Sequence, residues 1–123
     1  MVKKTFASIC ICLLAFLVTG CGISVFEGSR LGNDSMLVME YTWFDTIEEQ
    51  ELVLAEGDVV CIDVASESGN VAVSLRKGEE EPIYEEKEIP TSTVKVDITD
   101  SGTYTVTVIG QRAKGSISIT KEE

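Results

Sequence analysis

The stretch TVKVDITDSGTYTVTVI, residues 93–109, is the most informative part of the chain about its fold. In its second half an apolar or aromatic residue alternates strictly with threonine. Because successive side chains of a β-strand point to opposite faces, this alternation predicts a strand with one buried face and one solvent face. The expected core positions are Tyr104, Val106 and Val108, and the expected solvent positions are Thr103, Thr105 and Thr107. Asp100, Gly102 and Tyr104 also resemble a tyrosine corner, in which the phenol bonds to the preceding turn.

Outward from this stretch, runs rich in β-branched residues are separated by Gly, Pro, Asp or Asn about every 8 to 12 residues, a spacing typical of antiparallel sandwiches and barrels. The turns at 56–58, 67–70 and 100–102 predict hairpins, and 46–50 predicts one helical turn. The fold class is therefore predicted to be an all-β, jelly-roll-like antiparallel β-sandwich of about eight strands. The expected strands are 36–44, 51–55, 59–65, 71–76, 83–87, 93–98, 103–109 and 115–121.

The N-terminus predicts an export signal. Lys3 and Lys4 precede an apolar, uncharged run over residues 6–18. That run is shorter than the roughly 20 residues that a transmembrane helix needs, and it fits the hydrophobic part of a signal peptide. We expect a helical signal peptide over residues 1–20, a tether over 21–34 and the sandwich domain over 35–123.

The end of this signal, Val18-Thr19-Gly20-Cys21, resembles the lipobox of bacterial lipoproteins. The resemblance implies that a diacylglyceryl group is attached to the Cys21 thiol, that the chain is cut before Cys21, and that palmitate or another acyl chain is added to the new amine. Two or more acyl chains give a stable anchor. The implied location is the extracytoplasmic face of the cell membrane. An ordinary signal cut that leaves Cys21 as a free thiol is the alternative.

Removal of the signal leaves Cys61 as the one unmodified cysteine among four, since Cys10 and Cys12 lie within residues 1–20. No intramolecular disulfide is then expected. Because the polar Asp63 is expected to face solvent, the alternation of the strand directs Val60, Ile62 and Val64 inward and places Cys61 on the outer face. We interpret Cys61 as a small apolar residue rather than a redox or nucleophilic group.

Composition narrows the function. The 123 residues carry 21 acidic and 10 basic side chains and no histidine, and loss of Lys3 and Lys4 brings the net charge from −11 to −13. This charge argues against nucleic acid as a partner. Without histidine, a Ser-His-Asp triad cannot form, and no zinc, nucleotide or EF-hand motif is present. We therefore expect no enzyme, no cofactor and no metal site.

Two features offer alternative interpretations. The run 79–88 contains six glutamates, which we interpret as the protected edge of a sheet, with a surface for a cationic partner or loosely held calcium as the alternative. Three aromatic residues are candidates for stacking on a sugar ring. They are Trp43, Phe44 and Tyr84. Trp43 shares its expected face with Tyr41 and the core, whereas Phe44, beside Asp45, is the best candidate for exposure.

Two segments carry a resemblance to a known family: LAEGDVVCIDVASESGNVAVSL, residues 54–75, and VDITDSGTYTVTVIGQRAKGSISI, residues 96–119. They resemble small jelly-roll domains related to the bacterial prepeptidase C-terminal domain and to GOLD-type sandwiches. The chain is also similar to short bacterial lipoproteins that carry one such domain. The shared motifs are turn and core residues, so the resemblance implies a fold and no specific activity.

Together these observations predict a lipid-anchored, non-catalytic cell-surface domain that contacts an envelope protein or polymer. The alternative is a carbohydrate-binding module that uses Trp43, Phe44 and Tyr84 together with calcium. An exposed aromatic platform would favour the second interpretation.

Overall fold

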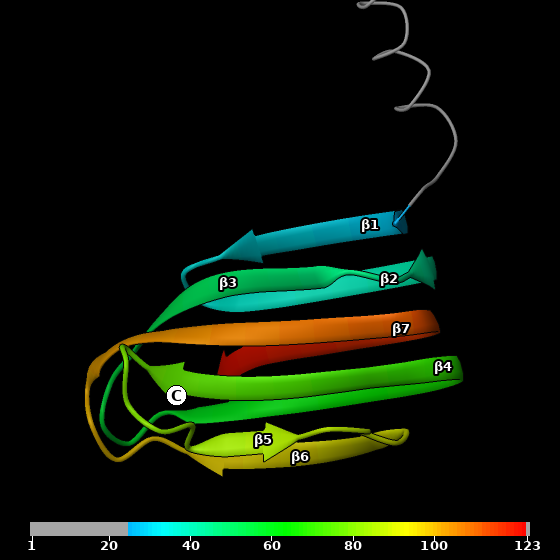
Figure 1. The fold of residues 1–123 in the computed structure, drawn as a ribbon. Helices are drawn as coiled ribbons and strands as arrows, with labels where there is room; N and C mark the ends of the chain where they lie inside the picture. Colours follow the sequence, from blue (N-terminus) through cyan, green and yellow to red (C-terminus); the bar gives the residue numbers. More distant parts are fainter. Residues whose placement is uncertain (1–24, 123) are drawn as a thin grey trace, which may run out of the picture.

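The computed structural model describes residues 25–122, and every regular element in that range is a β-strand (Figure 1). The predicted signal peptide and lipobox lie outside the described residues. The seven strands are β1 (Phe26–Asn33), β2 (Met36–Phe44), β3 (Ile47–Leu54), β4 (Val59–Lys77), β5 (Tyr84–Glu86), β6 (Ser92–Asp97) and β7 (Gly102–Glu122). No helix within residues 25–122 is long and apolar enough to cross a membrane.

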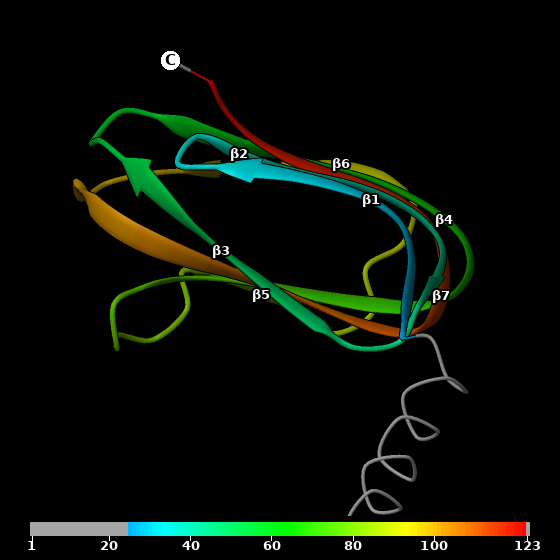
Figure 2. The same cartoon turned by 90° about the horizontal axis from the view of Figure 1, so that it is seen from above.

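Two long strands, β4 and β7, organise the sandwich. They pair with each other antiparallel along nearly their whole length, and both bend near the middle, at Ser66–Asn70 and at Gln111–Gly115. On one side of the bend their paired halves are flanked by β2 with β1 and by β6; on the other side they are flanked by β3 and β5. The hydrogen-bonded sheet therefore folds over into two layers, β1-β2-β7-β4-β6 and β3-β7-β4-β5, as Figure 2 shows from above.

This arrangement confirms the all-β sandwich and explains the difference between eight expected strands and seven observed ones. The expected strands 59–65 and 71–76 are the two halves of β4, and 103–109 and 115–121 are the two halves of β7. Counted as halves, and with β1 set aside as an additional edge strand, they give two layers of four strands in the order of a jelly roll. The predicted helical turn at 46–50 is wrong, because residues 47–50 begin β3 and pair with β7.

The three predicted hairpins are also wrong. The strands on either side of residues 56–58 and of 100–102 do not pair with each other, so these connections cross from one layer to the other. Residues 67–70 form the bend of β4 rather than a turn, and Gly69 there has φ 74°. At the facing bend, a Cβ on Gly115 (φ 147°) would lie 2.0 Å from the carbonyl oxygen of Ala65. Because glycine has no Cβ, Gly69 and Gly115 allow the backbones of β4 and β7 to approach each other closely at the bends.

The segment expected to be a tether is in part a strand. Residues 26–33 form β1, which pairs with β2 from Phe26↔Phe44 to Asn33↔Met36. The sequence FEGSRLGN has little apolar alternation because β1 is an edge strand with mostly exposed side chains. Its position comes from backbone pairing and from contacts with β3 rather than from a buried face.

The core lies between the layers and follows the predicted parity. Val106 and Ile62 are each 1% exposed, whereas Thr105 on the opposite face is only half-buried. Tyr104 is 2% exposed, and its hydroxyl donates a hydrogen bond of 2.7 Å to the carbonyl oxygen of Asp100, so the predicted tyrosine corner is confirmed. Within residues 25–122 the buried side chains are all apolar or aromatic, with cysteine and tyrosine as their most polar members.

Candidate functional site

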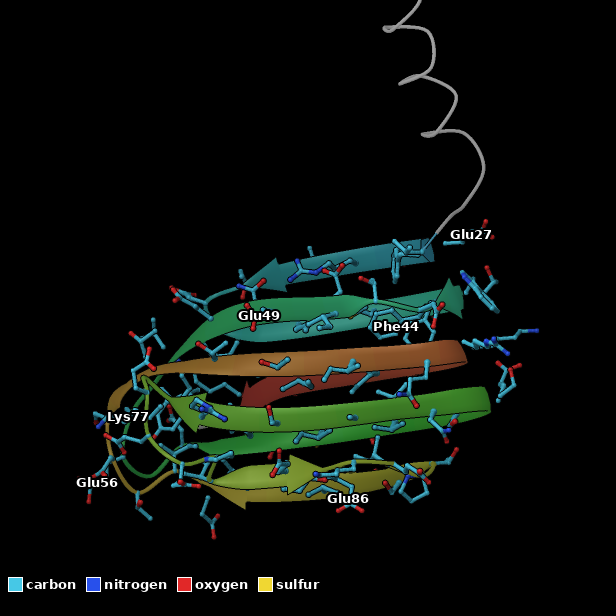
Figure 3. All side chains as sticks on the ribbon, viewed as in Figure 1. Glu27, Phe44, Glu49, Glu56, Lys77 and Glu86 are labelled. Carbon is cyan, nitrogen blue, oxygen red and sulfur yellow. The ribbon has the colours of Figure 1, made fainter. Side chains whose placement is uncertain are left out.

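The three aromatic candidates do not form a platform. Phe44 is 0% exposed and packs in an aromatic cluster with Tyr41 (ring centroids 5.0 Å apart) and Phe26 (5.7 Å). The prediction that Phe44 is exposed is therefore wrong. A bulge between Tyr41 and Phe44 in the pairing of β2 with β7 shifts the parity of the strand, and Phe44 turns into the core (labelled in Figure 3).

Trp43 and Tyr84, both half-buried, lie in different parts of the molecule. Trp43 pairs with Glu27 of β1, whereas Tyr84 pairs with Leu75 at the opposite edge of the other layer. Burial and the charge of Glu86 raise the pKa of Tyr84. None of the three surface hollows found over residues 25–122 is lined by Trp43, Phe44 or Tyr84.

The acidic run 79–88 has the edge position that the sequence predicts. Its central part is β5, a strand of three residues that has β4 as its one partner within the described sheet. Glu79, Glu80 and Glu81 are exposed in the turn before β5. No group of three or more His, Cys, Asp or Glu side chains in residues 25–122 is arranged to hold a metal ion.

Cys61 lies on the outer face of β4 and is 9% exposed. Its register neighbours are Lys95 on β6 and Thr120 on β7, and the ion pair between Lys95 Nζ and Glu122 Oε1 (3.4 Å) joins the strands on its two sides. Desolvation raises the pKa of the Cys61 thiol, and the charges of Asp63 and Glu122 raise it further. The thiol is therefore held in its protonated, poorly nucleophilic form.

A continuous surface on the outside of the layer β3-β7-β4-β5 is the most distinctive feature. We call it the acidic face. Its apolar row crosses three strands, where Ile47 is the register partner of Ile109 and Ile109 is the partner of Ala72. Ile47 is 57% and Ile109 37% exposed. The remaining outward residues of the paired strands are Glu49, Glu51, Val53, Thr103, Thr105, Thr107, Ser74, Arg76 and Glu85, with Glu79 beside them in the turn after β4.

Two shallow hollows lie over this face. One, of about 310 Å³, lies between β5 and the apolar row and includes Ser74, Glu85 and Ile109 in its lining. The other, of about 400 Å³, lies toward the turn after β4 and is lined by Glu49, Arg76 and Glu79 among others. The face is therefore a slightly concave sheet surface with an apolar row at one end and charged groups along the rest.

Sequence reasoning found the parity of the acidic face but not the face itself. The outward threonines of β7 are evident from their alternation with valine. However, the neighbours of β7 depend on which strands pair with it, and β3 and β4 reach it from distant parts of the chain. Because the sequence predicts a helical turn at 46–50, it does not identify Ile47 and Glu49 as strand residues.

A third hollow, of about 430 Å³, lies on the outside of the other layer, near the bends. It is polar, and its lining includes Ser29, Glu40 and Ser116, with Glu67 and Lys114 at its edge. Lys114 Nζ lies 3.7 Å from Glu67 Oε1, and both side chains are more than half exposed. An exposed pair of this kind contributes little to stability.

Comparisons with known proteins give no assignment. No protein-family model matches the chain, and no curated protein matches it. The resemblance to prepeptidase C-terminal and GOLD-type domains stays a prediction.

Two solved structures have a similar chain trace. One is the periplasmic inhibitor of g-type lysozyme, PliG, from Aeromonas hydrophila, with 13% identity, a TM-score of 0.46 and coverage of 79% of this chain and 88% of that one. The other is a cupin domain from Bordetella pertussis, with 11% identity, a TM-score of 0.39 and coverage of 83% and 100%. At these values we draw no functional conclusion from either.

Proposed function

We propose that this protein is a lipid-anchored, non-catalytic interaction domain on the extracytoplasmic face of the cell membrane, and that it binds a cationic protein through its acidic face. The observation that carries this proposal is the apolar row of exposed Ile47 and Ile109 with half-buried Ala72, which is continuous with a carboxylate-rich surface on the same strands.

The apolar row favours a protein partner. Single exposed apolar residues are common on protein surfaces, but apolar residues on adjacent strands form a patch that gains free energy when a partner covers it. Ile47 and Ile109 are register partners, so their side chains lie next to each other on the outer face. Threonine and serine around them offer hydroxyl groups for hydrogen bonds at the rim of such a contact.

The charge of the face favours a cationic partner. Five carboxylates on or beside the face outnumber two basic groups, those of Arg76 and Lys87. The carboxylates belong to Glu49, Glu51, Glu79, Glu85 and Glu86. Complementary charge speeds association and selects partners of opposite sign, and the net negative charge of the whole chain adds to that effect.

The carbohydrate alternative receives no support from the site geometry. The acidic face has no aromatic residue in its outward rows, and the aromatic candidates are either buried or far apart. Stacking on a sugar ring needs an exposed aromatic face, which Phe44 does not offer.

The anchor is part of the proposal and has its own test. Cys21 would carry the diacylglyceryl group, so Cys21→Ser should abolish labelling with radioactive or clickable palmitate and leave an uncut precursor. Cys61→Ser is the matched control, because it removes the other cysteine of the mature chain and should leave labelling unchanged. Normal labelling of the Cys21→Ser protein would remove the anchor from the proposal.

The binding face can be tested by site-specific photo-cross-linking in intact cells. A photoreactive amino acid at Thr107 reports on the acidic face, and one at Ser118 reports on the outer face of the other layer from the same strand. We expect a cross-linked cationic protein from Thr107 alone. Equal cross-linking from the two positions would contradict the proposal.

Charge reversal tests the same face by a second route. Glu49→Lys with Glu51→Lys should reduce cross-linking from Thr107 strongly, because two carboxylates of the face become positive charges. Glu40→Lys, which changes an exposed carboxylate on the opposite layer, is the control and should have little effect.

A further inference from the structure

Only a short length of chain lies between the proposed anchor and the first strand. β1 begins at Phe26, so five peptide units separate its first Cα atom from that of Cys21. An extended chain spans at most about 3.6 Å per residue, so the start of β1 lies within about 18 Å of an anchored Cys21. A tether of 14 residues would have left the orientation of the domain free, but this shorter connection restricts it.

The start of β1 belongs to one end of the sandwich. Phe26 pairs with Phe44, the last residue of β2, and Phe44 pairs with Ala113 at the bend of β7. The bend of β4 lies against the same part of β7, through Ser68↔Lys114. We call this the bend end. It comprises residues 25–27, 43–46, 67–69, 87–91 and 112–114 (Figure 1).

The opposite end carries the remaining connections, and we call it the loop end. It comprises residues 34–35, 55–58, 77–82 and 99–101. Figure 3 shows Glu56 and Lys77 at this end and Glu27 at the other. Strands of eight or nine residues run between the two ends, which at about 3.3 Å per residue places them roughly 30 Å apart.

The two ends differ in charge. The bend end has four acids and three bases. The acids are Glu27, Asp45, Glu67 and Glu88, and the bases are Lys87, Arg112 and Lys114. The loop end has seven acids and one base. The acids are Asp34, Glu56, Asp58, Glu79, Glu80, Glu81 and Asp100, and the base is Lys77. An anionic membrane surface therefore repels the loop end far more than the bend end within a Debye length.

The bend end also has side chains suited to a membrane interface. Val25 is 49% exposed, and Trp43, the register partner of Glu27, is half-buried on β2. The backbone N–H of Asp45 donates a hydrogen bond of 2.8 Å to the carbonyl oxygen of Val25, which fixes Val25 to this end. Tryptophan and basic side chains are enriched at the level of lipid headgroups.

We propose that the anchored domain stands on the membrane on its bend end, against the lipid headgroups, with the loop end directed away and the acidic face open to the side. This inference rests on the lipid anchor of the proposed function. The partner of the acidic face would then be recognised within roughly 30 Å of the bilayer surface, the length of one strand. Such a partner is itself held at the membrane surface or reaches it.

Energy transfer from tryptophan tests this orientation, because Trp43 is the one tryptophan of the chain. The acylated protein is placed in vesicles of neutral and anionic phospholipid that contain dansyl groups on the headgroups. Transfer from Trp43 is compared with transfer from Trp43→Phe/Glu80→Trp, which moves the donor to the loop end. A second variant, Trp43→Phe/Glu56→Trp, probes the loop end at another exposed position, and circular dichroism checks that each variant is folded.

We expect several-fold greater transfer from Trp43 than from either loop-end donor. A flexible insert of 20 Gly and Ser residues after Gly22 should reduce the transfer from Trp43 and remove most of the difference. Equal transfer from both ends without the insert would overturn the proposed orientation. Greatest transfer from Trp43→Phe/Thr105→Trp would overturn it as well, because the acidic face would then lie on the lipid. If mass spectrometry finds no acyl chain on Cys21, the anchor itself fails, and that result is distinct from equal transfer by an acylated protein.

Discussion

The two open sides of the sandwich are closed by different chemistry. On one side, edge strands β1 and β3 are joined by polar side chains. Arg30 Nε lies 2.8 Å from Glu48 Oε1, and Arg30 Nη2 donates hydrogen bonds to the carbonyl oxygen of Glu49 (2.7 Å) and to Gln50 Oε1 (3.2 Å). Gln50 Nε2 in turn donates to the carbonyl oxygen of Asn33, 3.1 Å away. We call these four groups the polar clasp: Arg30, Glu48, Gln50 and the Asn33 carbonyl.

On the other side, apolar side chains fill the gap between β5 and β6. Ile89, in the connection between these strands, is 4% exposed, and its backbone N–H donates to the carbonyl oxygen of Val71 (2.9 Å). Tyr84, Val94 and Val96 pack against the core beside it. Burial is non-directional and contributes most of the stability, whereas hydrogen bonds and ion pairs near water contribute less but fix a geometry. One side therefore stabilises the sandwich, and the other aligns its edges.

The largest effect is expected on the apolar side. Ile89→Ala removes a buried side chain and should lower the free energy of unfolding by about 2–4 kcal/mol in urea denaturation. Ile83→Ala is the matched control, because Ile83 precedes β5 and is 46% exposed; it should change stability by less than about 0.5 kcal/mol. Similar losses for the two variants would show that Ile89 does not close this side.

The dependence of stability on alkaline pH tests the burial of Tyr41, which lies in the aromatic cluster next to β1. Burial raises the pKa of Tyr41 to about 12 from an ordinary value of 10.0, so the folded protein keeps a proton that the unfolded chain releases between these values. The stabilisation from this group is fully present below pH 10. As the pH rises toward 12, the free energy of unfolding should fall by about 2 kcal/mol because of this group.

Tyr41→Phe keeps the ring in contact with Phe44 and removes the ionisable group. Its stability should fall less steeply over the same pH range, although burial also raises the pKa of Tyr84 and of Tyr104. An unchanged slope in thermal melts across this range would mean that Tyr41 is not the buried group that titrates.

Loss of the polar clasp should have a smaller effect. Arg30→Met keeps most of the aliphatic stem of the side chain and removes the guanidinium, so the free energy of unfolding should fall by about 1 kcal/mol. Hydrogen exchange should show the local consequence more clearly, with faster exchange of the β1 amides that pair with β2 and unchanged exchange in β6. Lys95→Met, which removes an exposed ion pair on β6, is the control and should leave β1 protected. Uniform faster exchange over all strands would contradict a local role.

The smallest expected effect is a difference in how salt changes the stability contributed by the two sides of the sandwich. At about 1 M salt the screening length falls to about 3 Å, so the stability gap between the native protein and Arg30→Met should narrow by a few tenths of a kcal/mol. The gap between the native protein and Ile89→Ala should stay the same or widen. Because salt also relieves repulsion within the acidic chain, the gaps rather than the absolute stabilities are compared. A narrowing of both gaps by the same amount would show that the two sides do not differ in this respect.

The sequence predicted what depends on local alternation. The inward valines of β7, the inward Ile62 of β4 and the tyrosine corner are each set by neighbours within a few residues, and the structure has them as expected. The edge position of β5 was also predictable, because clustered glutamates beside prolines are typical of an edge.

What the sequence did not predict depends on distant parts of the chain. β1 has no apolar alternation and is held by β2 and by the polar clasp. Phe44 is buried because a bulge shifts the parity of β2, and the position of a bulge is set by the pairing partner. The acidic face combines four strands, β3, β7, β4 and β5, whose adjacency follows from the bends of β4 and β7.

The bent strands have a consequence for how the protein folds and unfolds. Each of β4 and β7 belongs to both layers, so neither layer contains a complete set of strands without the other. The two strands are also separated in sequence by β5, β6 and their connections, so their pairing must close a long loop before either layer can form. We therefore expect folding to be slow for a chain of this size and to proceed without a stable half-sandwich, since topologies dominated by distant contacts fold slowly. Unfolding would likewise involve both layers in one cooperative transition, because separating β4 from β7 at one bend removes the central pair of both.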